Sequence, residues 1–278
     1  MIVAAPYELA DPHSYLGAHP AKGGVLVRAY RPDAESVRIL PMGVELERKR
    51  ADGIFEGVLE GASLPLDYEL EVRYPAGDSY VLRDPYSFLP SLGELDVHLA
   101  GEGRHEQLYA QLGAHPRELD GVAGVAFAVW APNAGSVSVV GDFDGWDGRL
   151  HPMRSLGASG IWELFVPGVL AGSRYKFELR TADSRLRLKA DPLAVRTEVP
   201  PKNASVVFES AYEWGDAAWL DHKPGASLIM VGVLLLLGLP LIAVLGWIAY
   251  GTLRGRLRRP APLPEDERWD AALRRSSD

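Results

Sequence analysis

The 278-residue chain contains no cysteine, which excludes disulfide bonds, thiolate metal ligands and thiol nucleophiles. Positive charge is in short supply, because 29 Lys and Arg residues stand against 37 Asp and Glu residues, for a formal net charge of −8. Such a chain is poorly suited to neutralise a phosphate backbone, so no nucleic-acid partner is expected. The amino terminus, MIVAAPYELADPHS, lacks basic residues and a long apolar run, so no signal peptide is predicted.

Charge is absent altogether from 225–253, a run of 29 residues. Its most apolar part, LIMVGVLLLLGLPLIAVLGWIAY at 228–250, would extend roughly 35 Å as a helix, enough for a bilayer core of about 30 Å. A buried core helix is the alternative, but Pro240 is better tolerated in a membrane helix. We therefore predict a transmembrane α-helix over 225–253, membrane localisation through it, and a basic, charged tail over 254–278.

The orientation of this predicted span stays open. Four arginines follow it directly, and by the positive-inside rule they would keep the tail cytoplasmic: Arg254, Arg256, Arg258 and Arg259. The domains before the span would then lie outside, although no signal for their export is predicted.

The chain also repeats itself. LGAHP occurs at 16–20 and again at 112–116, and GVLVRAYRPDAESVRIL from Gly24 matches GVAFAVWAPNAGSVSVV from Gly124. GIFEGV from Gly53 then matches GIWELFV from Gly160, with seven more residues in the second copy. The insertion falls within GDFDGWDGRLHPMRSLGASG. Two copies about 100 residues apart indicate a duplicated domain.

Both copies have β character. YELEV at 68–72 and YKFEL at 175–179 alternate apolar and charged residues, and turn signals such as PNAG and PAGD separate short runs of this kind. The predicted fold class is all-β. It consists of two tandem immunoglobulin-like β-sandwiches, at 1–100 and 117–220, joined by a helical connector at 101–116 and followed by the one transmembrane α-helix.

The inserted loop GDFDGWDG, at 141–148, is the most unusual stretch of the two copies. It places Trp146 on an exposed turn, where the indole either packs onto its own sandwich or offers a flat apolar face to a pyranose ring. Asp142, Asp144 and Asp147 are candidate calcium ligands, and two of the three are a candidate acid and base of a glycosidase. Their spacing departs from the EF-hand pattern and nothing builds a cleft around them, so we predict neither a metal site nor a cofactor.

The histidines of the chain are scattered. His19 and His115 occupy equivalent positions of the repeat, which favours a shared structural role over a metal site.

Several motifs in chain order resemble the amino-terminal half of bacterial 1,4-α-glucan (glycogen) branching enzymes: DPHSYLGAHP, GDFDGWDGRLHPM, GIWELFVPG, YKFEL, KADPLA and YEWGDAAWL. The second copy resembles carbohydrate-binding module family 48, the immunoglobulin-like sandwich that precedes the catalytic barrel of these enzymes. The first copy resembles the extra amino-terminal sandwich that some of them carry. The resemblance runs from about Tyr7 to Leu220.

The resemblance implies an α-1,4-glucan or glycogen partner and a binding site for it. In glycan-binding members a tryptophan of this loop stacks on the sugar, and a lysine and an asparagine add polar contacts. The matching residues here are Trp146, Lys176 and Asn203. A second stacking aromatic would fall within RTADSRLRLKADP, which contains none.

The resemblance also implies a catalytic (β/α)₈ barrel bearing the reacting carboxylates, which takes about 250 residues. Only 58 residues follow Leu220, so the chain alone is expected to be inactive and no catalytic residue is predicted.

Three hypotheses remain. The chain is the non-catalytic glucan-binding region of a glycogen branching enzyme in a truncated or fused form, a membrane-tethered α-glucan-binding protein, or a structural membrane-anchored β-sandwich without glycan binding. If glycogen is the ligand, the soluble domains are expected to be cytoplasmic.

Overall fold

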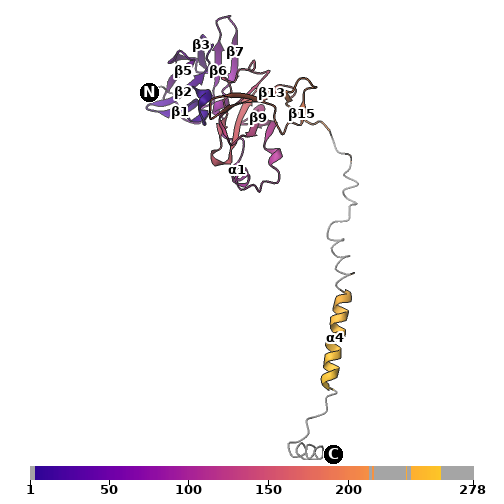
Figure 1. Ribbon diagram of the computed structural model, residues 1–278. Coiled ribbons are helices and arrows are strands. Elements are labelled where there is room, and N and C mark those ends of the chain that lie inside the picture. Colours follow the sequence, from indigo (N-terminus) through magenta and orange to yellow (C-terminus); the bar gives the residue numbers. More distant parts are fainter. Residues whose placement is uncertain (1–3, 213–214, 216–235, 237–238, 258–278) are drawn as a thin grey trace, which may run out of the picture. The chain divides into compact units, whose positions relative to one another are not determined.

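The computed structural model describes residues 4–212, 215, 236 and 239–257. The chain divides into two compact units, Met1–Ser210 and Ala211–Asp278, which are described separately. The first unit is built almost entirely from β-strands and holds both copies of the repeat (Figure 1).

The first copy forms one seven-stranded antiparallel sheet in the order β1-β2-β5-β4-β3-β6-β7. β4 joins its two halves, because it pairs with β5 through one end and with β3 through the other. Apolar residues of both halves meet in one core, as the alternating sequence predicts, so the two halves face each other and form the first sandwich. The strands are β1 (Gly17–Ala21), β2 (Gly24–Tyr30), β3 (Ser36–Leu40), β4 (Val44–Arg48), β5 (Ile54–Glu60), β6 (Glu69–Arg73) and β7 (Ser79–Arg83).

The second copy is a two-sheet sandwich. One sheet has the order β11-β12-β9-β8, and the other has the order β10-β13-β16-β15 with β14 paired to β13. The strands are β8 (Gly113–Leu119), β9 (Val122–Trp130), β10 (Ala134–Gly141), β11 (Arg154–Ser155), β12 (Ile161–Pro167), β13 (Arg174–Thr181), β14 (Leu186–Lys189), β15 (Arg196–Thr197) and β16 (Ser205–Val206).

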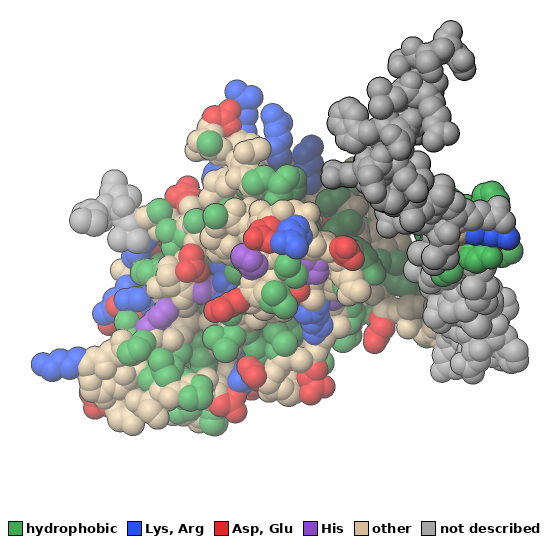
Figure 2. Space-filling model, turned by 90° about the horizontal axis from the view of Figure 1, so that it is seen from below, with side chains coloured by type: hydrophobic (Ala, Val, Ile, Leu, Met, Phe, Trp, Pro, Cys, Tyr) green, Lys and Arg blue, Asp and Glu red, His purple; other side chains and the backbone are tan. Residues whose placement is uncertain are grey.

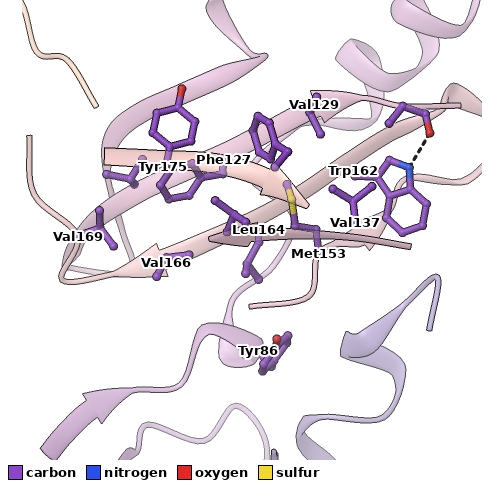
Figure 3. Packing of buried hydrophobic residues seen from close by; sticks show 14 of the residues in the cluster. Tyr86, Phe127, Val129, Val137, Met153, Trp162, Leu164, Val166, Val169 and Tyr175 are labelled. Atoms are coloured by element: carbon purple, nitrogen blue, oxygen red, sulfur yellow. Dashed lines mark hydrogen bonds between the residues drawn. The ribbon is translucent and has the colours of Figure 1, made fainter. Parts of the chain in front are cut away.

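Residues of both sheets fill the core of the second sandwich. Figure 3 shows Phe127 of β9 beside Tyr175 of β13, whose ring centroids are 5.1 Å apart. Trp162 lies in the same core, and its Nε1 donates a 3.0 Å hydrogen bond to the carbonyl of Ala131. The core also includes Tyr86, which follows the last strand of the first sandwich and donates to the backbone of the second. The two sandwiches therefore share buried side chains.

The repeated LGAHP begins the first strand of each sandwich. His19 Nε2 lies 2.9 Å from the carbonyl oxygen of Leu16, and His115 Nε2 lies 2.9 Å from that of Leu112. This equivalence confirms the predicted structural role of the two histidines.

A second duplicated contact lies beside the first. The Tyr68 hydroxyl donates to the buried carboxylate of Asp84, and the Tyr175 hydroxyl donates to that of Asp191. The same tyrosine–aspartate pair therefore fixes an equivalent loop in each sandwich, the one after β7 in the first and the one after β14 in the second.

The helix between the sandwiches lies earlier than predicted. It is α1 (Glu94–Gly101), whose start is capped by the Asp96 carboxylate accepting the N–H of Gly93. The predicted connector, 101–116, instead holds a short 3₁₀ turn and the first residues of β8. The 3₁₀ turns of the chain are η1 (Pro6–Glu8), η2 (Pro12–Ser14), η3 (Pro85–Ser87), η4 (Leu108–Ala110) and η5 (Gly157–Ser159).

Helix α4 (Leu239–Leu257) is the described part of the predicted transmembrane segment and tail. No helix among the described residues is long and apolar enough to cross a membrane. The predicted span over 225–253 is therefore not supported by the described residues. Residues 225–235, 237–238 and 258–278 of the predicted span and tail lie outside the described residues.

Candidate functional site

The inserted loop of the second sandwich is held together by one buried carboxylate. Asp144 Oδ1 accepts the N–H groups of Gly141 and Trp146, both at 2.9 Å. Its Oδ2 lies 2.9 Å from Nδ1 of His151, three residues beyond the loop. The Asp144 side chain is completely buried, so its hydrogen bonds rather than solvent fix the loop. Asp144 is therefore the residue that shapes the turn carrying Trp146.

Trp146 itself has an uncommon backbone conformation. Its φ is +67°, directly after Gly145 at +66°, and a non-glycine residue in this region costs about 1 kcal/mol. The hydrogen bond to Asp144 offsets this cost. The residue is 37% exposed, so Trp146 is partly packed on the protein and partly open to solvent.

Asp142 ties the loop to strand β13. Its carboxylate receives two 2.8 Å hydrogen bonds from the Arg174 guanidinium, which also reaches Glu198 at 3.3 Å. The bonds from Arg174 lower the pKa of Asp142, and the Trp146 side chain adds a smaller contribution of the same sign. The ion pair therefore anchors the loop that carries Trp146 to strand β13.

Asp147 is engaged in another ion pair. Arg149 bonds both of its oxygens, at 2.6 to 3.0 Å, and thereby lowers the pKa of Asp147. Arg149 also reaches Asp33 of the first sandwich at 2.6 Å. The three loop aspartates thus serve structural ion pairs and hydrogen bonds, and the described residues contain no cluster of three or more potential metal ligands.

Lys176 and Asn203 lie together. Lys176 Nζ donates a 2.5 Å hydrogen bond to Oδ1 of Asn203, which precedes the short strand β16. Tyr175 and Phe177 point into the core, so Lys176 between them lies on the outer face of the sheet. Arg174 lies two residues before Lys176 and shares that face. Its guanidinium is bonded to Asp142 of the inserted loop.

The three residues predicted from sequence are therefore arranged on one side of the second sandwich. Lys176 and Asn203 touch, and Trp146 lies on the loop that Asp142 ties to Arg174, two residues before Lys176 on the same strand. Sequence reasoning missed Arg174, whose only signal is its position directly before the YKFEL motif.

The stretch without a second aromatic offers apolar surface of another kind. Leu186 and Leu188 of β14 are each 51% exposed and lie opposite Arg180 and Glu178 of β13. Directly paired residues project on the same side of a sheet, so these leucines lie on the face that carries Lys176. Across the view of Figure 2, acidic and basic side chains are interspersed with apolar ones.

Comparison with protein families separates the same two halves. Residues 111–194 match the family model of carbohydrate-binding module 48 (isoamylase N-terminal domain). Residues 4–86 match that of the N-terminal domain of the alpha-1,4-glucan branching enzyme GlgB. The resemblance read from the motifs is confirmed for these two amino-terminal domains.

The curated relatives are similar over the same region. The 1,4-alpha-glucan branching enzyme GlgB of Myxococcus xanthus (strain DK1622) is 55% identical over 217 residues, which make up 77% of this chain and 30% of that protein. The enzyme of the same name from Frankia casuarinae is 56% identical over 222 residues, 77% of this chain and 27% of its own. The chain thus spans about 30% of the length of the relatives it matches.

Solved structures show a weaker likeness. The pullulanase of Anoxybacillus sp. LM18-11, solved with maltotriose, is 16% identical over 69% of this chain and 27% of its own, with a TM-score of 0.29. A likeness of this size carries no functional argument.

Proposed function

We propose that the first unit of this chain is a non-catalytic α-glucan-binding region of the kind found at the amino terminus of glycogen branching enzymes. The observation that carries the proposal is the contact between Lys176 and Asn203 on the outer face of β13, together with the exposed Trp146 on the loop that Asp142 ties to the same strand. An exposed indole provides an apolar surface for a pyranose ring, and the ammonium and amide groups hydrogen-bond hydroxyls.

The role of the region is to hold a glucan chain rather than to break its bonds. The relatives named as branching enzymes are more than three times as long as the matched region, so their activity is proposed here only for a protein or assembly that includes the rest. In that setting the region would keep a long glucan near the reacting groups, which raises its local concentration.

Co-sedimentation with glycogen tests the proposal on the full chain in a non-ionic detergent. The wild-type chain is expected to sediment with glycogen, and Trp146→Ala is expected to remain in the supernatant. Trp130→Ala is the matched control, because Trp130 is 61% exposed and lies at the end of β9 in the other sheet. Equal sedimentation of all three proteins would contradict a site at Trp146.

A membrane-tethered glucan-binding protein is the second candidate. It is favoured by α4, on which Ile242, Trp247 and Tyr250 are each more than 60% exposed. Flotation of the full chain with liposomes would support this candidate, and its recovery among the unbound proteins would contradict it.

A purely structural β-sandwich without glycan binding is the third candidate, and it predicts no co-sedimentation with glycogen. If the ligand is glycogen, we infer that the first unit faces the cytoplasm, where such a ligand would be met.

A further inference from the structure

A groove of about 540 Å³ runs between the two sandwiches. The first sandwich contributes β7, which is the edge strand of its sheet, together with Arg31 and Tyr74. The second sandwich contributes Phe143, Asp144 and Gly145 of the inserted loop. The volume lies in the range of small-molecule sites, about 300–1,000 Å³.

Aromatic rings line the side of the groove that belongs to the first sandwich. Tyr74 and Tyr80 are in edge contact, with ring centroids 6.1 Å apart and planes at 69°. Tyr80 is 56% exposed and its neighbour Val81 is equally exposed. Since β7 is an edge strand, one side of its backbone is also free of sheet hydrogen bonds within the described sheet.

A buried guanidinium group lies in the same wall. Arg31 is only 6% exposed, and it donates one long hydrogen bond, of 3.5 Å, to the carbonyl of Tyr30. Its Nε has no hydrogen-bond partner among the described residues. Buried donors are normally paired, so this one indicates a missing acceptor.

Arg31 has a buried acidic neighbour, Asp84. Burial raises the pKa of Asp84, and the positive charges of Arg31 and Arg83 oppose that rise. Arg83 is also paired with Asp67. A neutral ligand rich in hydroxyl groups would supply the acceptor that Arg31 lacks without placing a further negative charge near the buried Asp84.

The groove adjoins the proposed glucan site. The loop that carries Trp146 towards solvent forms the groove wall with its preceding residues, Phe143, Asp144 and Gly145. The inserted loop thus borders the groove through Phe143, Asp144 and Gly145, and it carries Trp146 of the proposed glucan site. A single extended ligand can therefore contact both.

We propose that an α-1,4-glucan chain stacked on Trp146 continues across the inserted loop into this groove, where Tyr80 and Arg31 form a second contact with it. The inference rests on the proposed function and extends it, because it gives the first sandwich a part in glucan recognition. Tyr80 would stack on a sugar ring at the exposed edge of β7, and Arg31 would donate to a hydroxyl at the base of the groove.

Isothermal titration of the full chain in detergent with maltoheptaose tests this inference. Loss of one stacking contact in Tyr80→Ala is expected to raise the dissociation constant roughly fivefold. Tyr80→Phe keeps the ring and is expected to bind as the wild type does. Tyr109→Ala is the matched control, because Tyr109 is 66% exposed but lies in the connector, outside the groove.

The outcomes separate this inference from the proposed function. Weaker binding by Tyr80→Ala alone among these three variants supports the second contact. An unchanged dissociation constant for Tyr80→Ala, with weaker binding by Trp146→Ala, would overturn the groove and leave the site at Trp146 intact. Equal weakening by Tyr80→Phe would overturn the stacking contact, and no binding by the wild-type chain would overturn both proposals.

Discussion

The ammonium group of Lys176 donates a 2.5 Å hydrogen bond to the side-chain oxygen of Asn203. The two residues are 27 positions apart, and both lie on the outer face of the second sandwich. Lys176 thus supplies a donor to Asn203 Oδ1, and the bond fixes both side chains. A glucan hydroxyl at this point would meet a donor and an acceptor that are already held in place, which lowers the entropy cost of binding.

The pairing of Lys176 with Asn203 predicts non-additive effects on glycogen binding. Lys176→Met and Asn203→Ala should each weaken binding roughly three- to tenfold, the value of about one hydrogen bond. The double variant should be hardly weaker than either single variant, because each change disables the same unit. Titration with maltoheptaose measures this, and fully additive losses would contradict a joint role.

Asp144 should affect glucan binding through the shape of the loop. In Asp144→Asn, an amide replaces a carboxylate that accepts three hydrogen bonds, so the turn that carries Trp146 should loosen and glycogen binding should weaken roughly tenfold. Quenching of tryptophan fluorescence by acrylamide should show greater access to Trp146 in this variant.

Asp147→Asn is the control for the Asp144 variant. It lies in the same loop but serves a partly exposed pair with Arg149, and it should change neither binding nor quenching. Weakened binding by Asp144→Asn without greater quenching would argue against a role through the loop.

The duplicated tyrosine–aspartate contacts should have similar effects on stability in the two sandwiches. Tyr68→Phe and Tyr175→Phe each leave a buried carboxylate without one of its donors, at Asp84 and Asp191. Each change is expected to lower the free energy of unfolding by about 1–3 kcal/mol. Urea denaturation followed by circular dichroism measures the loss, and a negligible change in either sandwich would contradict the common role.

His13 should make the protein less stable in acid. Burial, assisted by the positive charge of Arg154, lowers the pKa of His13 from 6.5 to about 3. Below pH 6.5 the unfolded chain therefore gains a proton that the folded chain does not, and the free energy of unfolding falls by up to about 1.4 kcal/mol per pH unit until the pH approaches 3. Replacement of His13 by an uncharged side chain removes this loss of stability in acid.

Urea titrations from about pH 7 to about pH 4.5 compare the wild type with His13→Phe. As the pH falls, the free energy of unfolding of the wild type should decrease steadily relative to that of His13→Phe. Phe fits the contact, because His13 already packs edge-on against Tyr86 at a centroid distance of 5.0 Å. The exposed His98, replaced in His98→Gln, serves as control, and parallel profiles for wild type and His13→Phe would refute the prediction.

The repeat in the sequence predicted the β-strands of both copies because their alternating residues match a half-buried strand. The motifs YELEV and YKFEL mark Tyr68 and Tyr175, but they did not indicate the contacts of these tyrosines with Asp84 and Asp191. Side-chain contacts of this kind depend on how loops return to the sheet, which local periodicity does not record.

Helix α1 was misplaced for a related reason. None of its residues is buried, so no apolar periodicity marks it in the sequence. The start at Gly93 depends instead on the Asp96 cap, a signal too weak to place the helix by itself.

At the candidate site, too, the sequence indicates some residues but not the contacts between them. Trp146, Lys176 and Asn203 could be named from the motifs, whereas the Arg174 and Asp144 contacts could not. Arg174 reaches Asp142 because β10 and β13 pair in one register, and a shift by one residue would turn it to the other face. Asp144 shapes the loop through backbone donors, which the sequence does not locate.

Retardation in a native gel cast with increasing glycogen is the most direct test of glucan binding through Trp146. The full-length wild type in detergent should migrate more slowly as glycogen increases, and Trp146→Ala should migrate as it does without glycogen. Migration of the wild type that is independent of glycogen, or retardation of Trp146→Ala equal to that of the wild type, would contradict the account.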